Sequence, residues 1–418
     1  AGVSAATVAP ILILIDSATN PFSAYIQELL NAEGVKDYEL RPLSNLTSSA
    51  LLSGRRAVIL GESSPSGTQI TLLDNFVSAG GGLVAMRPAA GLNAILGVTR
   101  QTATTAEGYL RITDPTQGAG LYGDTMQFHG TSGQYTLNGA VQIAELYSGR
   151  ATTTGRPAIT LASRGSGKAV LFSYDLARSV ALTRQGNPAN GDVDTDGDGI
   201  VRSIDIYRNW ADLERTSVPQ ADMQQRLLVR LLQTVAGQPI PRLWYFPSSA
   251  PTVVVATGDA HGAPNSYYQP QIDALRAIGA VMTFYVSTAS TPEPGTMDAW
   301  EALGFDFGPH PYVDCGYACG YDNAFDWFES TYGFTPRTVR THQVRWAGWS
   351  DAAAVEAQHG VGMDFNAYLW GPWVKTASGA PALGYLNGGG QPMRFVDASG
   401  TILPIYQQYT NLVDEFLA

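Results

Sequence analysis

The chain has 418 residues, and its 36 acidic against 25 basic side chains give a formal net charge of −11 at pH 7. This charge excludes a binder of nucleic acid or of anionic membranes, because such proteins gain affinity from clustered Lys and Arg. The longest apolar run, residues 8–15, is too short to cross a bilayer, so the sequence predicts no membrane span. A hydrophobic fraction of 44% is typical of globular proteins, and the length predicts two or three domains.

Several features indicate an exported protein that is secreted or displayed at the cell surface. Only 15% of the residues are charged, and the chain opens on Ala1-Gly-Val-Ser rather than on Met, as a chain cleaved by signal peptidase does. The two cysteines, Cys315 and Cys319, lie four positions apart. In an oxidising compartment they would close a small disulfide loop, and the alternative is two reduced, unrelated thiols.

The first hundred residues alternate between strand-like and helix-like segments. This alternation predicts an α/β sheet whose parallel strands are joined by right-handed crossovers. The expected strands cover residues 8–15, 57–60 and 83–86, and the expected helices cover residues 22–32, 45–52 and 68–79.

The pattern changes after residue 109, where short strands bounded by glycine are expected up to residue 174. An amphipathic helix over residues 222–235 follows, and then a proline-rich stretch over residues 238–247. This stretch predicts the boundary between two domains that pack firmly together, residues 1–247 and residues 248–418.

Residues 194–205 match the pattern of an EF-hand-like calcium loop, with oxygen ligands at the first, third, fifth and twelfth positions. Carboxylates this close repel one another unless a hard cation neutralises them, and Gly199 allows the turn that wraps the ion. The alternative is a solvated acidic loop. The expected calcium ligands are Asp194, Asp196, Asp198, the backbone carbonyl of Ile200, and Asp205.

The second domain is expected to open on a buried strand over residues 252–256. Asp259 and His261 follow that strand, and a helix over residues 269–278 and a strand over residues 281–286 come next. Functional groups of α/β sheets and barrels gather at the carboxyl ends of the strands. The sequence therefore predicts a site around Asp259 and His261.

Two further stretches carry chemically active side chains. His310 and Asp314 are four positions apart, so a helical turn starting at Pro311 would point both at one ion. Arg340 and His342 follow an extended run over residues 336–339. Four of the five histidines of the chain fall in this half, and such crowding of a scarce residue indicates a site.

The order of these stretches resembles the polysaccharide deacetylases (NodB-like, carbohydrate esterase family 4). The resemblance implies a (β/α) barrel in which Asp259 is the catalytic base, Arg340 orients that base, and His310 and Asp314 bind a metal ion. The chain departs from the family pattern at two places: Ala260 stands where a metal-binding Asp is expected, and Asp314 replaces a histidine.

The resemblance leaves the metal ligands open. The ion would be held by His310, Asp314 and either Asp259 or His261, a mixed nitrogen and oxygen set that suits zinc or a similar divalent transition metal. If Asp259 becomes a ligand, it no longer serves as the base. The ion would polarise the scissile carbonyl and lower the pKa of bound water.

The late histidine segment of the family is not found, because no histidine follows His359 before the chain stops at Ala418. The acid that protonates the leaving group is therefore missing or is His342, and the resemblance implies a second domain that is incomplete at its C-terminus. Aromatic side chains near the site could stack on sugar rings, although core packing is their commoner role. These side chains are Trp346, Trp349, Tyr368, Trp370 and Trp373.

The opening of the first domain resembles the flavodoxin-like fold of class I glutamine amidotransferases. Those enzymes place a cysteine on the turn after a central strand, whereas this chain has no cysteine before Cys315. Thiol chemistry is therefore excluded there, and the first domain is expected to be a scaffold or binding module. The phrase Thr257-Gly-Asp-Ala-His-Gly262 is also similar to exported bacterial proteins with this two-domain order.

The sequence thus predicts an exported α/β protein with a flavodoxin/amidotransferase-like N-terminal domain and a NodB-like (β/α) barrel. The leading function is metal-dependent hydrolysis by a polysaccharide deacetylase-like esterase or amidase, with calcium and zinc or another divalent transition metal as cofactors. A polysaccharide or glycan is the expected partner. The alternative, favoured by Ala260, is a non-catalytic surface, assembly or glycan-binding protein on a degenerate deacetylase fold, for which self-assembly stays open.

Overall fold

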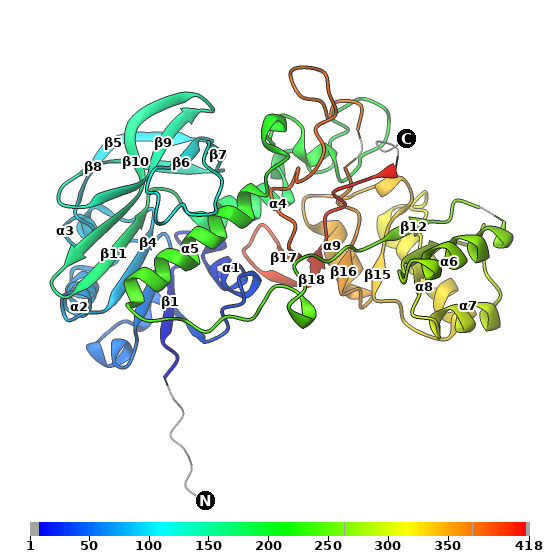
Figure 1. Ribbon diagram of the computed structural model, residues 1–418, viewed down its shortest axis with the longest axis horizontal. Coiled ribbons are helices and arrows are strands. Elements are labelled where there is room, and N and C mark those ends of the chain that lie inside the picture. The colour runs from blue at the N-terminus through cyan, green and yellow to red at the C-terminus, as the bar shows by residue number, and fades with distance from the viewer. Residues whose placement is uncertain (1–7, 263, 370, 415–418) are drawn as a thin grey trace, which may run out of the picture.

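The computed structural model describes residues 8–262, 264–369 and 371–414 (Figure 1). It shows a mixed α/β architecture with one large central sheet and three smaller sheets. Residues 1–7, on which part of the export prediction rests, and Trp370 lie outside the described residues. Within the described part of the chain, no helix is both long and apolar enough to cross a membrane.

The central sheet has nine strands and combines parallel with antiparallel pairing. In spatial order its strands are β2 (Tyr38–Pro42), β1 (Ile11–Ile15), β3 (Ala57–Leu60), β4 (Gly82–Met86), β11 (Gly167–Phe172), β10 (Thr152–Arg164), β9 (Val141–Gly149), β6 (Tyr109–Ile112) and β7 (Met126–Gln127). The strands from β2 to β11 pair in parallel, and those from β11 to β7 pair antiparallel. Apolar residues fill β1, β3 and β4 almost completely, as a sheet covered on both faces requires.

Helices cover both faces of the central sheet, and each face has its own hydrophobic core. One face packs against α1 (Ile26–Ala32), α4 (Leu176–Gln185) and α5 (Gln220–Ala236), of which α5 crosses the sheet in Figure 1. The other face packs against α2 (Gly67–Ser78) and α3 (Asn93–Leu96), and a two-stranded sheet of β5 (Val98–Ala106) and β8 (Thr131–Leu137) flanks it.

The helix expected over residues 45–52 is wrong. The segment forms two short 3-10 turns instead, Leu43–Asn45 and Ser49–Leu52. Asn45, Thr47 and Ser48 interrupt it, and such side chains favour turns and caps because they compete for backbone hydrogen bonds.

The second half of the chain, coloured from green through yellow to red in Figure 1, forms two short sheets with helices around them. The first sheet is parallel and contains β12 (Thr257–Asp259), β13 (Thr283–Val286) and β14 (Asp306–Pro309). The second has the order β15 (Thr338–Val339), β16 (Met363–Asp364), β18 (Ile402–Gln407) and β17 (Met393–Val396). The accompanying helices are α6 (Tyr268–Ala277), α7 (Pro294–Glu301), α8 (Tyr317–Tyr332) and α9 (Asp351–Gln358). Because these are two separate sheets, the predicted (β/α) barrel is not confirmed over the described residues.

The buried strand expected over residues 252–256 is also wrong. Strand β12 begins only at Thr257, where its neighbour β13 begins to pair with it. The valines that precede it are exposed, and Val254 retains 87% of its accessible surface. An apolar run alone does not distinguish a buried strand from an extended segment that no neighbouring strand covers.

The two halves of the chain contact each other through β17. Arg394 of β17 forms an ion pair with Glu28 of α1 at 2.7 Å, and Gln185 of α4 exchanges two hydrogen bonds with the backbone of Val396. The domain boundary at residue 247 stays a prediction.

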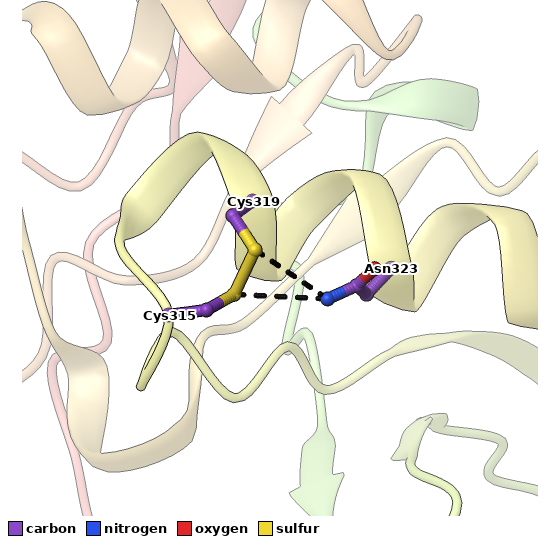
Figure 2. The surroundings of a disulfide bond; sticks show 3 residues. All are labelled: Cys315, Cys319 and Asn323. Carbon is purple, nitrogen blue, oxygen red and sulfur yellow. Dashed lines mark hydrogen bonds between the residues drawn. A yellow bond between two sulfur atoms is a disulfide. The ribbon is translucent and has the colours of Figure 1, made fainter.

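The predicted disulfide is confirmed. Cys315 and Cys319 are bonded to each other at the start of α8 (Figure 2). The side-chain amide of Asn323, one turn further along the helix, lies 3.6 Å from both sulfur atoms. The bond therefore closes a small loop that includes the first residues of α8.

Candidate functional site

Three parallel strand ends deliver the polar residues of the second half to one place. Asp259 ends β12, His310 follows β14, and Arg340 follows β15. Strands β14 and β15 lie close because Gly308 has no side chain: a Cβ at this position would be 2.5 Å from the backbone oxygen of Thr338. The carboxyl ends of β12, β14 and β15 thus meet, as the sequence predicts.

Three histidines from these segments form the centre of the site. The ring centroids of His261 and His310 are 4.9 Å apart, those of His261 and His342 are 5.3 Å apart, and those of His310 and His342 are 5.5 Å apart. One nitrogen of each ring lies within 4.8 Å of the others, a spacing that a single metal ion can bridge. His310 is buried, His342 is half-buried and His261 is exposed, so the cluster opens to solvent on one side.

The hydrogen bonding of His310 fixes which of its nitrogens is available. Nδ1 lies 2.8 Å from the backbone oxygen of Arg340, and because a carbonyl only accepts, Nδ1 carries the proton. Nε2 therefore presents a lone pair, and it is buried without a hydrogen-bond partner among the described residues. Burial lowers the pKa of His310 to about 4, which keeps the ring neutral near pH 7. A neutral imidazole held through its other nitrogen is the usual form of a histidine ligand.

Asp259 is oriented by Arg340. The Nη1 of Arg340 donates to Asp259 Oδ1 at 3.2 Å, and its Nη2 donates to Thr257 Oγ1 at 2.6 Å. The guanidinium lies over the rings of Tyr285 and Tyr368, at 5.4 and 5.3 Å from their centroids. Because Arg340 is only 3% exposed, its charge and geometry are well fixed beside the carboxylate.

Asp314 lies outside the histidine cluster. Residues 311–314 form no helical turn, so the expected turn at Pro311 is wrong. The side chain of Asp314 is 74% exposed and pairs with Arg345 at 3.1 Å. Ala260 packs into the core beside α6.

His342 is the third histidine of the cluster. It does not lie apart from the other two, as an acid that protonates the leaving group would. Its ring stacks on Tyr312 with a centroid distance of 3.9 Å, and burial lowers its pKa. The remaining histidine of this half, His359, lies elsewhere, with its Nε2 3.2 Å from Asp322.

The aromatic residues expected to stack on sugars have mixed positions. Trp346 and Trp349 are buried in hydrophobic cores, 5% and 6% exposed. Tyr368 lies against the Arg340 guanidinium, Trp373 is half-buried in another core, and Trp370 lies outside the described residues.

The acidic loop brings three of its expected calcium ligands together. One carboxylate oxygen each of Asp194, Asp196 and Asp198 lies within 4.8 Å of the others. Asp194 accepts hydrogen bonds from the backbone of Gly197 and Gly199, each at 2.7 Å. Ile200 is half-buried. Asp205 is fully buried and outside the group of three, and its two oxygens accept from the backbone N–H groups of Thr195 and Arg202.

The sequence analysis missed a polar network behind the histidines. Glu356 and Asn366 are fully buried; Asn366 accepts from the backbone N–H of Thr341, the residue between Arg340 and His342, and donates to Glu356. The available signal was weak: an acidic residue within the alanine-rich stretch that becomes α9, and a polar alternation at Asp364 and Asn366.

No family model matches the chain, and no curated protein matches its sequence. Solved structures similar to part of it include a β-galactosidase from Bacillus circulans sp. alkalophilus, with 13% identity over 40% of this chain and 29% of that chain and a TM-score of 0.33. Another is an exo-β-1,4-mannosidase from Opitutaceae bacterium strain TAV5, with 16% identity, 41% and 32% coverage and a TM-score of 0.32. A third is an α-L-fucosidase isoenzyme from Paenibacillus thiaminolyticus, with 14% identity, 56% and 34% coverage and a TM-score of 0.37.

These comparisons correct the expected relationships. The similar structures are glycoside hydrolases, so the resemblance to polysaccharide deacetylases and to class I glutamine amidotransferases is wrong. The positions of Asp314 and Ala260 also depart from the deacetylase pattern. Asp314 pairs with Arg345 outside the histidine cluster, and Ala260 packs into the core, so neither contributes to the ligand set that the pattern implied. The chain spans less than a third of the β-galactosidase, and likenesses this low leave the activity to be inferred from the residues of this chain.

Proposed function

We propose that this protein is a metal-dependent hydrolase in which His261, His310 and His342 bind one zinc-like ion. The observation that carries the proposal is the buried, unpartnered Nε2 of His310, which belongs to the same ligand group as nitrogens of the other two rings. A buried acceptor without a donor costs free energy of about 1–3 kcal/mol, and a bound cation removes that cost.

The donor set suits zinc. His261, His310 and His342 would each supply one imidazole nitrogen to the ion, and a set of three histidines is found in catalytic rather than structural zinc sites. Such an ion polarises a carbonyl and lowers the pKa of bound water to about 7. His310 contributes a second feature of such sites, because its Nδ1–H is donated to a backbone carbonyl and fixes the ring.

Asp259 is the general base of the proposed reaction. Its carboxylate is 18% exposed, lies at the last residue of β12, two residues before His261, and is held by Arg340, so it can accept a proton from a nucleophilic water in the opening of the site. Arg340 is a positioning residue that fixes the carboxylate. In this scheme His342 is a metal ligand and not the acid.

The reaction class we propose is hydrolysis of an ester or amide bond, with a glycan as the molecule that carries it. Tyr312 stacks on His342 while 37% exposed, and Tyr267, 60% exposed, lines a small hollow beside Asp259. Exposed aromatic rings next to a site offer flat apolar faces on which a sugar ring can stack. The proposed location is extracellular, which the disulfide between Cys315 and Cys319 supports.

The test is metal content followed by activity. Protein purified without added metal and dialysed against a mild chelator is titrated with zinc, and we expect about one tightly bound ion per chain at the histidine cluster. The His310→Ala variant should lose this ion and the zinc-dependent hydrolysis of chromogenic acyl esters. His129→Ala is the matched control, because His129 is equally buried but pairs with Glu107 in the other half of the chain.

Two outcomes would overturn the proposal. If the wild-type protein binds no transition metal, the histidine cluster is not a metal site. If it binds zinc but hydrolyses neither esters nor amides, the hydrolase assignment fails, and the non-catalytic glycan-binding or assembly alternative takes its place.

A further inference from the structure

The backbone of residues 340–342, which carries both Arg340 and His342, is held by three hydrogen bonds in succession. The oxygen of Arg340 accepts from His310 Nδ1 at 2.8 Å. The N–H of Thr341 donates to Asn366 Oδ1 at 2.6 Å, and the N–H of His342 donates to the backbone oxygen of Pro311 at 2.9 Å. Two of these bonds join the segment to the His310 loop, and the third joins it to Asn366.

Asn366 is fully buried, and its amide has one orientation. Its Nδ2 donates to Glu356 Oε1 at 2.9 Å, which leaves Oδ1 to accept from Thr341. Its own backbone N–H donates to Asp364 Oδ1 at 2.8 Å. Glu356 therefore determines which atom of the Asn366 amide faces the segment of His342.

Glu356 is in turn held by helix α8. Its Oε1 accepts from Tyr321 Oη at 2.7 Å and from Tyr317 Oη at 3.2 Å, and Tyr321 Oη also lies 2.7 Å from Thr341 Oγ1. Burial raises the pKa of Glu356 well above its usual range, with Asp364 as a further cause. Polar groups this deeply buried are costly unless a network satisfies them, and such networks fix one arrangement of the groups they join.

The segment needs this support because the chain turns sharply directly after His342. Gln343 and Val344 have φ values of 60° and 46°, in the left-handed region that side-chain-bearing residues rarely adopt. The His342 ring is only half-buried and stacks on the partly exposed Tyr312. A metal ligand must stay within about 0.5 Å of its place, and little around the ring itself provides that precision.

We propose that Asn366 and Glu356 are positioning residues that fix His342 for metal binding by holding the Thr341 peptide. The inference rests on the proposed function, since it takes His342 to be a metal ligand. Neither side chain contacts the histidine rings: Glu356 orients Asn366, Asn366 holds the N–H of Thr341, and Thr341 precedes His342.

The experiment compares zinc affinity and the visible spectrum of the cobalt-substituted protein among three variants. Asn366→Ala should weaken zinc binding by about 10–100-fold, the usual effect of losing a group that orients a ligand, and should alter the cobalt bands. Glu356→Ala removes the acceptor that orients the Asn366 amide, so it should weaken zinc binding and alter the cobalt bands in the same direction as Asn366→Ala. Asn387→Ala is the matched control, because Asn387 is equally buried and also bonds a backbone N–H and a side-chain carbonyl, yet belongs to another segment.

Asn366→Ala and Asn387→Ala should both lower stability in urea unfolding, but only Asn366→Ala should change zinc affinity and the cobalt spectrum. A folded Asn366→Ala protein with wild-type affinity and spectrum would overturn the positioning role while leaving the metal site intact. A wild-type protein that binds no zinc would instead overturn the proposed function. If Asn366→Ala does not fold, Asn366→Asp retains the acceptor for Thr341 but loses the donor to Glu356. Weaker zinc binding would then support the role of Glu356 in orienting residue 366, and unchanged binding would overturn that role.

Discussion

The chain contains two buried histidines that have different interaction partners. His129, 2% exposed, lies 2.6 Å from a carboxylate oxygen of Glu107 and stacks on Trp210 with ring centroids 4.1 Å apart. His310, 1% exposed, donates through Nδ1 to a backbone carbonyl and has no partner at Nε2 among the described residues. Burial lowers the pKa of both rings, so burial does not distinguish them.

A similar contrast holds between two groups of strand ends, one in each half of the chain. After β3 and β4 of the central sheet, Glu62 pairs with Arg87 and faces Arg178 at 3.6 Å, so opposite charges meet. After β12, β14 and β15, three imidazoles meet, each able to offer a lone pair. Polar residues at the carboxyl ends of parallel strands therefore do not identify a site by themselves. The two regions differ in how their polar groups interact. In the central sheet they form ion pairs with one another, whereas the three histidines present lone pairs that a cation can bind.

The largest expected difference between the two regions comes from neutralising one carboxylate in each. Asp259→Asn removes the proposed base and weakens its contact with Arg340, so ester hydrolysis should fall by about 10²–10⁴-fold with zinc retained. Glu62→Gln removes the carboxylate shared by Arg87 and Arg178, so it should leave hydrolysis unchanged and lower the free energy of unfolding by about 1–3 kcal/mol.

Steady-state kinetics, zinc titration and urea unfolding of both variants check this prediction. Equal hydrolysis by Asp259→Asn and wild-type protein would remove Asp259 from the mechanism. A loss of hydrolysis in Glu62→Gln at unchanged zinc content would show that the central sheet takes part in the reaction.

Much of the fold could be predicted because it depends on local patterns. The apolar runs that become β3 and β4 and the helical spacing of α2 and α5 lie within two residues of their predicted positions. The exposed valines before β12 show the limit, because burial of an extended segment depends on a neighbouring strand that local sequence does not specify.

The site could be predicted only in part. His261, His310 and Arg340 were recognised because each follows a strand end, and the sequence places all three in one region. Asp314 was selected by its spacing from His310, yet no helix forms there and Arg345 binds its carboxylate. Asn366 acts through a backbone N–H on another segment, and that kind of contact leaves no pattern in the sequence.

A smaller effect is expected in the pH dependence of stability. Burial raises the pKa of Asp364 to about 7, so its carboxyl stays protonated in the folded protein where the unfolded chain already ionises. The contribution of Asp364 to stability is thus full below about pH 4, declines as the pH rises to about 7, and is constant above that. Glu356 faces Asp364, and its carboxyl pKa is raised as well, whereas Arg340 favours ionisation of Asp364.

Asp364→Asn tests this dependence because the amide does not titrate. The difference in unfolding free energy between the wild-type and variant proteins, measured in urea at several pH values, should shrink or reverse as the pH rises through this window. Parallel profiles would show that Asp364 is already ionised when buried. The central sheet shows the opposite arrangement, because Glu62 forms ion pairs with Arg87 and Arg178 rather than facing another carboxyl.

The smallest expected effect concerns the loop over residues 194–205, for which calcium binding stays a prediction. Three carboxylates within 4.8 Å of one another repel, and calcium at about 5 mM should therefore raise Tm by about 2–6 °C if the loop binds it with the affinity of extracellular calcium modules. Asp194→Ala should abolish the shift, because Asp194 organises the loop through Gly197 and Gly199 as well as offering an oxygen. Asp114→Ala is the control: Asp114 also accepts two backbone N–H groups in a turn but is not a member of a carboxylate cluster.

The loop continues into Val201 and Ser203, whose backbone groups bond to Trp346 and Val344, close behind His342. An identical Tm with and without calcium in the wild-type protein would leave a solvated acidic loop. A calcium shift that also strengthened zinc binding would show that the acidic loop and the histidine cluster are coupled through residues 344–346.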